Sequence, residues 1–195
     1  MNRRRGIAAA LVTTAGFAVG LAFALHSSPD LPSATVGRLI LPIPRGFNSY
    51  PRPVNRGPGS PLASRVITNY PVPADTTIDR VLSHWAAADM KYVYVKNYNH
   101  GAPSFVVALE LSLDSPDGPG CIGPCPPPSV RLHLPLDPSQ PWVQEQVANG
   151  DPSFRHGYFR FHGQLYSVVY WIGGDAQPSD RAALLSALRS IRPAR

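Results

Sequence analysis

The chain has 195 residues, 44% of them hydrophobic and only 15% charged, and a formal net charge of +6. This length accommodates one domain of ordinary size plus a terminal segment. Three of the eighteen basic residues precede residue 6, whereas all twelve acidic residues follow residue 25, so the later part carries only +3. Because its basic residues are scattered along the sequence, we expect no nucleic-acid partner.

The first predicted element is an apolar helix at 6–25, directly behind the three arginines at 3–5. About twenty apolar residues in a helix cross the roughly 30 Å of a bilayer's hydrocarbon, and the arginines hold the near end in the cytoplasm. A cleaved signal peptide is the alternative, since Ala22-Phe23-Ala24 supplies a small-x-small cleavage site. In both cases everything after Leu25 lies outside the cytoplasm, and the membrane is a partner of the uncleaved form.

Residues 26–61 contain eight prolines and little hydrophobic periodicity, which predicts an extended, semi-rigid spacer. The short apolar run Leu39–Leu41 is an exception that would suit an edge strand. We therefore expect a signal or anchor helix at 1–25, a proline-rich linker at 26–61, and an extracytoplasmic domain at 62–195.

The domain begins with a helix. Thr76-x-x-Asp79 resembles a capping box, and apolar residues then recur at helical spacing from Ile78 to Trp85. This helix should run to about Asp89. Residues 91–98 are rich in Tyr and Val and predict a strand.

Residues 104–113 alternate apolar and polar side chains, which is typical of a strand with one buried face. Residues 129–136 alternate in the same way, so we expect the two runs to form a hairpin. Cys121 and Cys125 lie in the Gly- and Pro-rich loop between them. Outside the cytoplasm disulfides persist, and the turn lets the two sulfurs meet. A structural disulfide is therefore expected, with a free pair or a redox or metal role as the alternatives.

Pro141 and Gly150 bracket a predicted short helix. A hairpin should follow, with strands at 157–162 and 165–172 joined by a type II′ turn at Gly163-Gln164. In that register Phe161 faces Tyr166 and Phe159 faces Val168.

Ser179 should cap the last helix, whose apolar stripe is Leu184, Leu185, Leu188 and Ile191. The order of elements predicts an α+β fold. We expect a two-layer sandwich in which helices cover one face of an antiparallel sheet of about five strands.

The hairpin and helix at 158–192 resemble the closing elements of small exported actinobacterial cell-envelope proteins of unknown function. The resemblance implies a location and a fold but no activity.

The opposite, uncovered face of the sheet is the candidate site. Aromatic rings there would stack on a ligand, and arginine and histidine would hydrogen-bond to it. The expected ligand-binding residues are Tyr94, Arg131, His133, His156, Tyr158, Arg160 and Trp171. His156 and His162 lie six residues apart on one strand, about 20 Å, so they cannot share a metal. We expect no metal and no cofactor.

The leading functional hypothesis is a non-catalytic envelope protein that binds a protein, glycan or lipid partner. The alternative is a secreted hydrolase with a site built from His156, His133 and a loop carboxylate. No Gly-x-Ser-x-Gly elbow accompanies them, so we expect no catalytic residue elsewhere.

Overall fold

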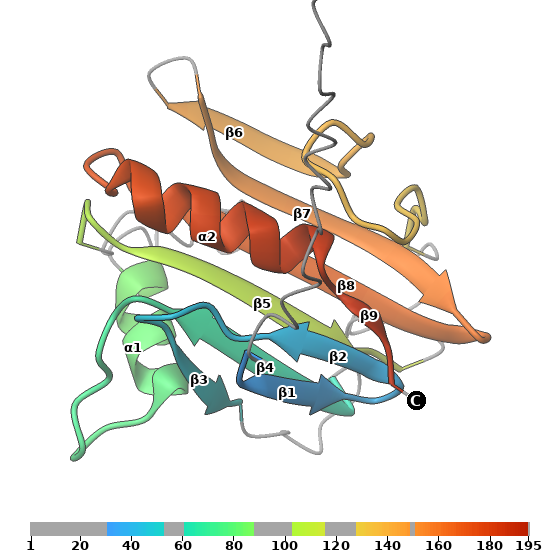
Figure 1. The fold of residues 1–195 in the computed structure, drawn as a ribbon, viewed down its shortest axis with the longest axis horizontal. Coiled ribbons are helices and arrows are strands. Elements are labelled where there is room, and N and C mark those ends of the chain that lie inside the picture. Colours follow the sequence, from blue (N-terminus) through green and yellow to red (C-terminus); the bar gives the residue numbers. More distant parts are fainter. Residues whose placement is uncertain (1–30, 53–60, 88–102, 116–127, 149–150, 195) are drawn as a thin grey trace, which may run out of the picture. The chain divides into compact units, whose positions relative to one another are not determined.

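The computed structural model describes residues 31–52, 61–87, 103–115, 128–148 and 151–194 (Figure 1). They belong to one compact unit, Leu31–Arg195. The expected membrane or signal helix, the strand at 91–98 and the two cysteines lie outside the described residues, so those expectations stay predictions. Within the described part, no helix has the length and apolarity needed to span a bilayer.

Two antiparallel sheets and two helices make up the fold, which confirms the α+β class (Figure 1). The small sheet has the order β1-β2-β9, with β1 at Ser33–Val36, β2 at Leu39–Pro42 and β9 at Arg192–Pro193. The large sheet has the order β3-β4-β5-β8-β7-β6. Its strands are β3 (Asn48–Pro51), β4 (Ala63–Thr68), β5 (Val107–Leu113), β6 (Gln144–Ala148), β7 (Asp151–Phe161) and β8 (Gln164–Ile172). The helices are α1 (Ile78–Ala87) and α2 (Pro178–Arg189).

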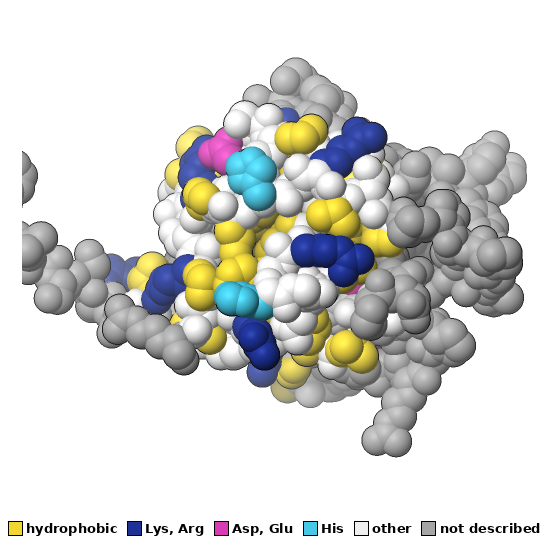
Figure 2. All heavy atoms as spheres, turned by 90° about the vertical axis from the view of Figure 1, so that its right-hand side faces the viewer, with side chains coloured by type: hydrophobic (Ala, Val, Ile, Leu, Met, Phe, Trp, Pro, Cys, Tyr) yellow, Lys and Arg dark blue, Asp and Glu magenta, His cyan; other side chains and the backbone are white. Residues whose placement is uncertain are grey.

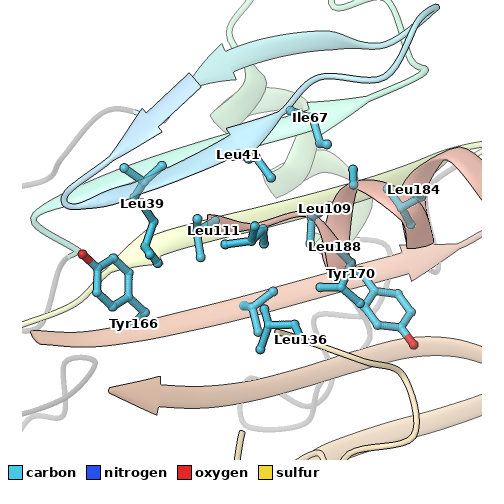
Figure 3. Close-up of a cluster of buried hydrophobic side chains, with 14 of the residues drawn as sticks. Leu39, Leu41, Ile67, Leu109, Leu111, Leu136, Tyr166, Tyr170, Leu184 and Leu188 are labelled. Atoms are coloured by element: carbon cyan, nitrogen blue, oxygen red, sulfur yellow. The ribbon is translucent and has the colours of Figure 1, made fainter. Parts of the chain in front are cut away.

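The larger core lies between one face of the large sheet and a layer made of α2 and the small sheet. Figure 3 shows leucines of β2, β5 and α2 pointing toward one another, with Tyr166 and Tyr170 of β8 at the two sides. Alternation along β5 sends Leu109 and Leu111 into this core, as the sequence predicts. Leu184 and Leu188 of α2 are fully buried here, which confirms most of the predicted stripe.

The other face of the large sheet is also covered, by α1. Ile78, Val81 and Leu82 of this helix pack against Val106 and Ala108 and form a second core with their neighbours. The two helices therefore lie on opposite faces, and the expected sandwich with one open face is wrong. β5 is a central strand that is buried on both faces, although its side toward α1 also carries the buried polar residues Glu110 and Ser112.

Residues 31–52 also differ from the expectation, because they form β1, β2 and β3 and not a linker. Gly37, at a φ of 57°, makes the tight turn between β1 and β2, and Val36 and Leu39 beside it are fully buried. The prolines occupy positions that a sheet tolerates: Pro42 ends β2, and Pro51 ends the edge strand β3. The proline content therefore led to β1 and β3 being missed, while the strand expected at Leu39–Leu41 is present as β2, in the centre of the small sheet and not at an edge.

Two further expected elements are wrong. Residues 129–136 form no named strand; Val130 makes one isolated bridge to Tyr158, and β5 pairs with β4 and β8 instead. The predicted helix after Pro141 is the strand β6, antiparallel to β7. Pairing with an available sheet edge outweighs the weak local preference of a short segment.

The β7–β8 hairpin is confirmed, although its turn lies one residue earlier than expected. His162 and Gly163 have φ angles of 48° and 76°, the conformation of a type I′ turn. Phe159 consequently pairs with Tyr166. This register differs from the predicted one by two residues, so every side chain keeps its predicted face.

At α2, Gln177 is the N-cap and the helix begins at Pro178, so the expected cap at Ser179 is wrong.

Candidate binding surface

Two of the expected ligand-binding residues belong to the core. Trp171 is only 2% exposed and packs in the second core beneath α1. Tyr158 is 8% exposed, and its backbone oxygen accepts hydrogen bonds from the N–H groups of Arg131 and Leu132. Neither ring presents a surface on which a ligand could stack, so their expected exposure is wrong. For Trp171 the cause is α1, which packs on the face that the sequence left open.

The remaining expected residues are basic and reach solvent to different degrees. Arg131, His133 and Arg160 are exposed, and His156 is half-buried. The His156 ring packs edge-on against Tyr158 at 4.6 Å between centroids. Tyr94 lies outside the described residues. The part of the expected site that the structure brings to the surface is therefore cationic and not aromatic.

His133 and His156 occupy separate environments. Gln140 ties down the loop at His133, where its Oε1 accepts from the His133 N–H at 3.1 Å and its Nε2 donates to the His133 carbonyl at 3.0 Å. His156 lies on β7 and packs against the neighbouring Tyr158. Among the described residues, no group of three or more His, Cys, Asp or Glu side chains could hold a metal ion.

A polar network that the sequence did not predict lies beneath α1. Arg52 donates from Nε to Asp79 of α1 at 2.6 Å and from its terminal nitrogen to Glu110 of β5 at 2.8 Å. Glu110 also accepts from Ser64 at 2.8 Å and from Ser112 at 3.2 Å. Burial alone would lower the pKa of Arg52, but the two carboxylates outweigh it and raise that pKa further. The network attaches α1 to the sheet and leaves Arg52 fully charged.

Asp114 lies at the end of β5 and is 5% exposed. Its backbone N–H donates to Leu165 at 2.9 Å, and its Oδ2 has no hydrogen-bond partner among the described residues. Burial raises the pKa of its carboxyl to about 6, against the opposing effect of a hydrogen bond with Ser167. The negative charge of Glu110 adds to the increase.

Exposed basic side chains gather at one end of the molecule. Figure 2 shows arginine and histidine side chains among hydrophobic ones on the side that holds the β7–β8 turn and β9. We call this surface the basic end. Its members are Arg38, Arg131, His133, Arg160, His162, Arg189 and Arg192, all of them exposed.

Hydrogen bonds hold the separate segments of the basic end together. The Tyr166 hydroxyl accepts from the backbone N–H of Arg38 at 3.0 Å and donates to Gln164 at 2.9 Å, which joins the β1–β2 turn to the β7–β8 hairpin. The N–H of Ala194 donates to the Arg38 carbonyl at 2.8 Å, so the chain after β9 lies on the same turn. These segments are distant in sequence but form one continuous surface.

A shallow hollow of about 520 Å³ lies within the basic end. It is lined by Leu134, Pro135, Arg189, Ser190, Ile191, Arg192 and Pro193. Arg189 donates to Asp137 at 2.8 Å, and this ion pair holds the pKa of Asp137 well below its usual range. The hollow thus combines apolar walls with two guanidinium groups.

The charges of this surface are largely unbalanced. Among the described residues, no carboxylate forms an ion pair with Arg38, Arg160 or Arg192. At the other end of α2, Asp175 and Asp180 supply negative charge instead. The molecule therefore presents a positive surface on one side that is suited to an acidic partner.

Comparison with known proteins adds no further information. Searches against protein families, curated proteins and solved structures found no match to this chain. The resemblance to small exported envelope proteins stays a prediction.

Sequence reasoning found Arg131, His133 and Arg160 of this surface but missed Arg38 and Arg192. Pairing of β2 with β9 places Ile40 opposite Arg192, and no local pattern in the sequence signals that contact. The charges look scattered along the chain because segments from both ends of the domain build the surface.

Proposed function

We propose that the protein is a non-catalytic binding protein that acts outside the cytoplasm and recognises an acidic partner through its basic end. It is tethered by the helix at 6–25 or released by cleavage near Ala24. The observation that carries the proposal is a set of three arginines, Arg38, Arg160 and Arg192, that have no carboxylate partner among the described residues and lie on one continuous surface. The arginines at 3–5 and the apolar run behind them support the location.

The hydrolase alternative has less support. General acid–base chemistry needs the acid, the base and the reacting group within hydrogen-bond reach of one another. His133 lies beside Gln140 on a loop, whereas His156 packs on Tyr158 within β7. The described carboxylate at that loop, Asp137, is already paired with Arg189. We therefore propose binding and not hydrolysis.

Charge reversal on the full-length chain in detergent tests this function, with poly-L-glutamate as the acidic probe. We expect Arg160→Glu/Arg192→Glu to weaken binding of the probe by about tenfold, because each reversal turns a favourable exposed charge contact into a repulsive one. The measurement is the dissociation constant at low salt, repeated at high salt, where screening should reduce the difference between the variants.

The matched control is Arg45→Glu/Arg80→Glu, which changes the net charge by the same amount. Arg45 follows the far end of β2 from Arg38, and Arg80 lies in the first turn of α1; both are exposed. We expect the control variant to lose much less affinity. Equal losses in the two variants would show that net charge, and not the basic end, determines binding.

A further inference from the structure

We infer that the acidic partner of the basic end is the anionic headgroup layer of the membrane in which the N-terminal helix is anchored. In this view the tethered domain lies on the bilayer with Arg38, Arg160 and Arg192 toward the lipid phosphates. This inference rests on the proposed function, and it concerns the uncleaved form of the protein.

The first argument is the length of the tether. The predicted membrane helix ends at Leu25, and β1 begins at Ser33, so only the seven residues 26–32 separate them. Seven extended residues span at most about 25 Å. The linker at 26–61 expected from sequence would have allowed the domain to stand far from the bilayer, but its residues 33–36, 39–42 and 48–51 are strands of the fold. A domain on so short a tether stays close to the headgroups at a high effective concentration.

The second argument is charge. At a bilayer surface that contains anionic lipids, each arginine contributes about a fivefold factor to binding. Arg189 already has Asp137 as a partner, so it adds less. Arg38, Arg160 and Arg192 have no described carboxylate partner, and together they would favour the docked orientation by about 100-fold.

The third argument is the mixed character of the surface. Proteins that lie on membranes combine basic side chains with apolar groups that enter the boundary between headgroups and acyl chains. Val130 is exposed next to Arg131, and the hollow beside Arg192 has Leu134, Ile191 and Pro193 in its walls. Figure 2 shows this interleaving of hydrophobic and basic side chains. A soluble polyanion would use the charges alone, whereas an anionic lipid layer uses both features.

Hydrogen–deuterium exchange on the full-length chain in lipid nanodiscs tests the inference. One set of discs contains phosphatidylcholine alone, and the other contains phosphatidylcholine with phosphatidylglycerol. We expect exchange at 162–165 and 190–194 to slow several-fold in the anionic discs. Residues 175–180, at the other end of α2 from Arg189, serve as the internal control and should not change.

The variants used with poly-L-glutamate make the result specific. Arg160→Glu/Arg192→Glu should lose the protection in anionic discs, and Arg45→Glu/Arg80→Glu should keep it. Equal exchange in the two kinds of disc overturns the membrane inference; if poly-L-glutamate still binds, the proposed function survives that failure. If the probe fails to bind as well, both are overturned. Protection that persists in Arg160→Glu/Arg192→Glu also overturns the inference, because the membrane would then contact another surface.

Discussion

Asp114 shows how one buried side chain links pH to stability in this domain. Its carboxyl lies at the end of β5, almost fully buried, with Oδ2 unpartnered among the described residues. Burial raises its pKa to about 6, well above the ordinary value of an aspartate carboxyl. The folded state binds the Asp114 proton more tightly than the unfolded state does. Loss of this proton therefore lowers the free energy of unfolding as the pH rises from about 4 to about 6. Above that range the cost is fully present.

We therefore expect Asp114→Asn to raise the free energy of unfolding by about 1–2 kcal/mol at pH 8, since it removes the buried charge and keeps the shape. The gain should disappear below pH 4, where the native carboxyl is protonated in both states. Urea unfolding at the two pH values measures it. Asp175→Asn, at an exposed residue, is the control and should change stability by less than about 0.5 kcal/mol. A gain that is equal at both pH values would contradict this interpretation.

The sequence indicates on which face of the sheet Asp114 lies, but not that it is buried. Glu110, Ser112 and Asp114 are spaced by two, so an extended strand places all three on one face. Their burial was not predictable, because it depends on what lies on that face. Trp171 illustrates the same limit: its face was predicted correctly from the hairpin alternation, but its exposure was not.

At the scale of elements, α1 depends on a charged connection to the sheet. Arg52 bridges Asp79 of α1 and the buried Glu110 of β5. Removing the arginine would leave Glu110 buried without its counter-ion, which is costly. Arg52 is itself about one-third exposed in its side chain, so solvent screens part of the effect.

We expect Arg52→Ala to lower the free energy of unfolding by about 2 kcal/mol. Glu110→Gln in the same background removes the unpaired charge and should recover a large part of the loss. Urea unfolding of the two single variants and the double variant gives the coupling energy directly. If the effects of the single variants simply add, the network does not hold α1 as described.

Elements with strong local patterns were predictable from sequence. The helix after Thr77, the β7–β8 hairpin and the last helix were confirmed, because each has enough apolar periodicity to specify its structure alone. The strands β1, β3 and β6 were missed, and β2 was expected at an edge, whereas it is the central strand of the small sheet. Each has at most five residues, and a strand this short gains its stability from distant partners and not from its own sequence.

At the scale of the whole molecule, the basic end exists only because the chain folds back on itself. Arg38 and Arg192 come from opposite ends of the domain, and the pairing of β2 with β9 brings them together, while Tyr166 of β8 accepts a hydrogen bond from the Arg38 backbone. Scattered basic residues in a sequence therefore do not exclude a charged surface in the folded protein. That explains why only part of the candidate surface was predictable.

The location of this surface can be tested in whole cells. A single cysteine at the exposed Ser186 of α2, in a Cys121→Ser/Cys125→Ser background, should react with a membrane-impermeant maleimide in intact bacteria. If the predicted N-terminal helix directs α2 outside the cytoplasm as proposed, permeabilising the cells should add little labelling. Gel analysis of the labelled protein measures the fraction modified. Labelling that requires permeabilisation would contradict an extracytoplasmic location.

Pairing of β2 with β9 also has a consequence for biogenesis. Ile40 cannot meet Arg192, and α2 cannot complete the larger core, until nearly the whole polypeptide has been synthesised. Folds dominated by such long-range contacts form slowly. We therefore expect a chain that lacks α2 and β9 to lose both the small sheet's third strand and one wall of the larger core.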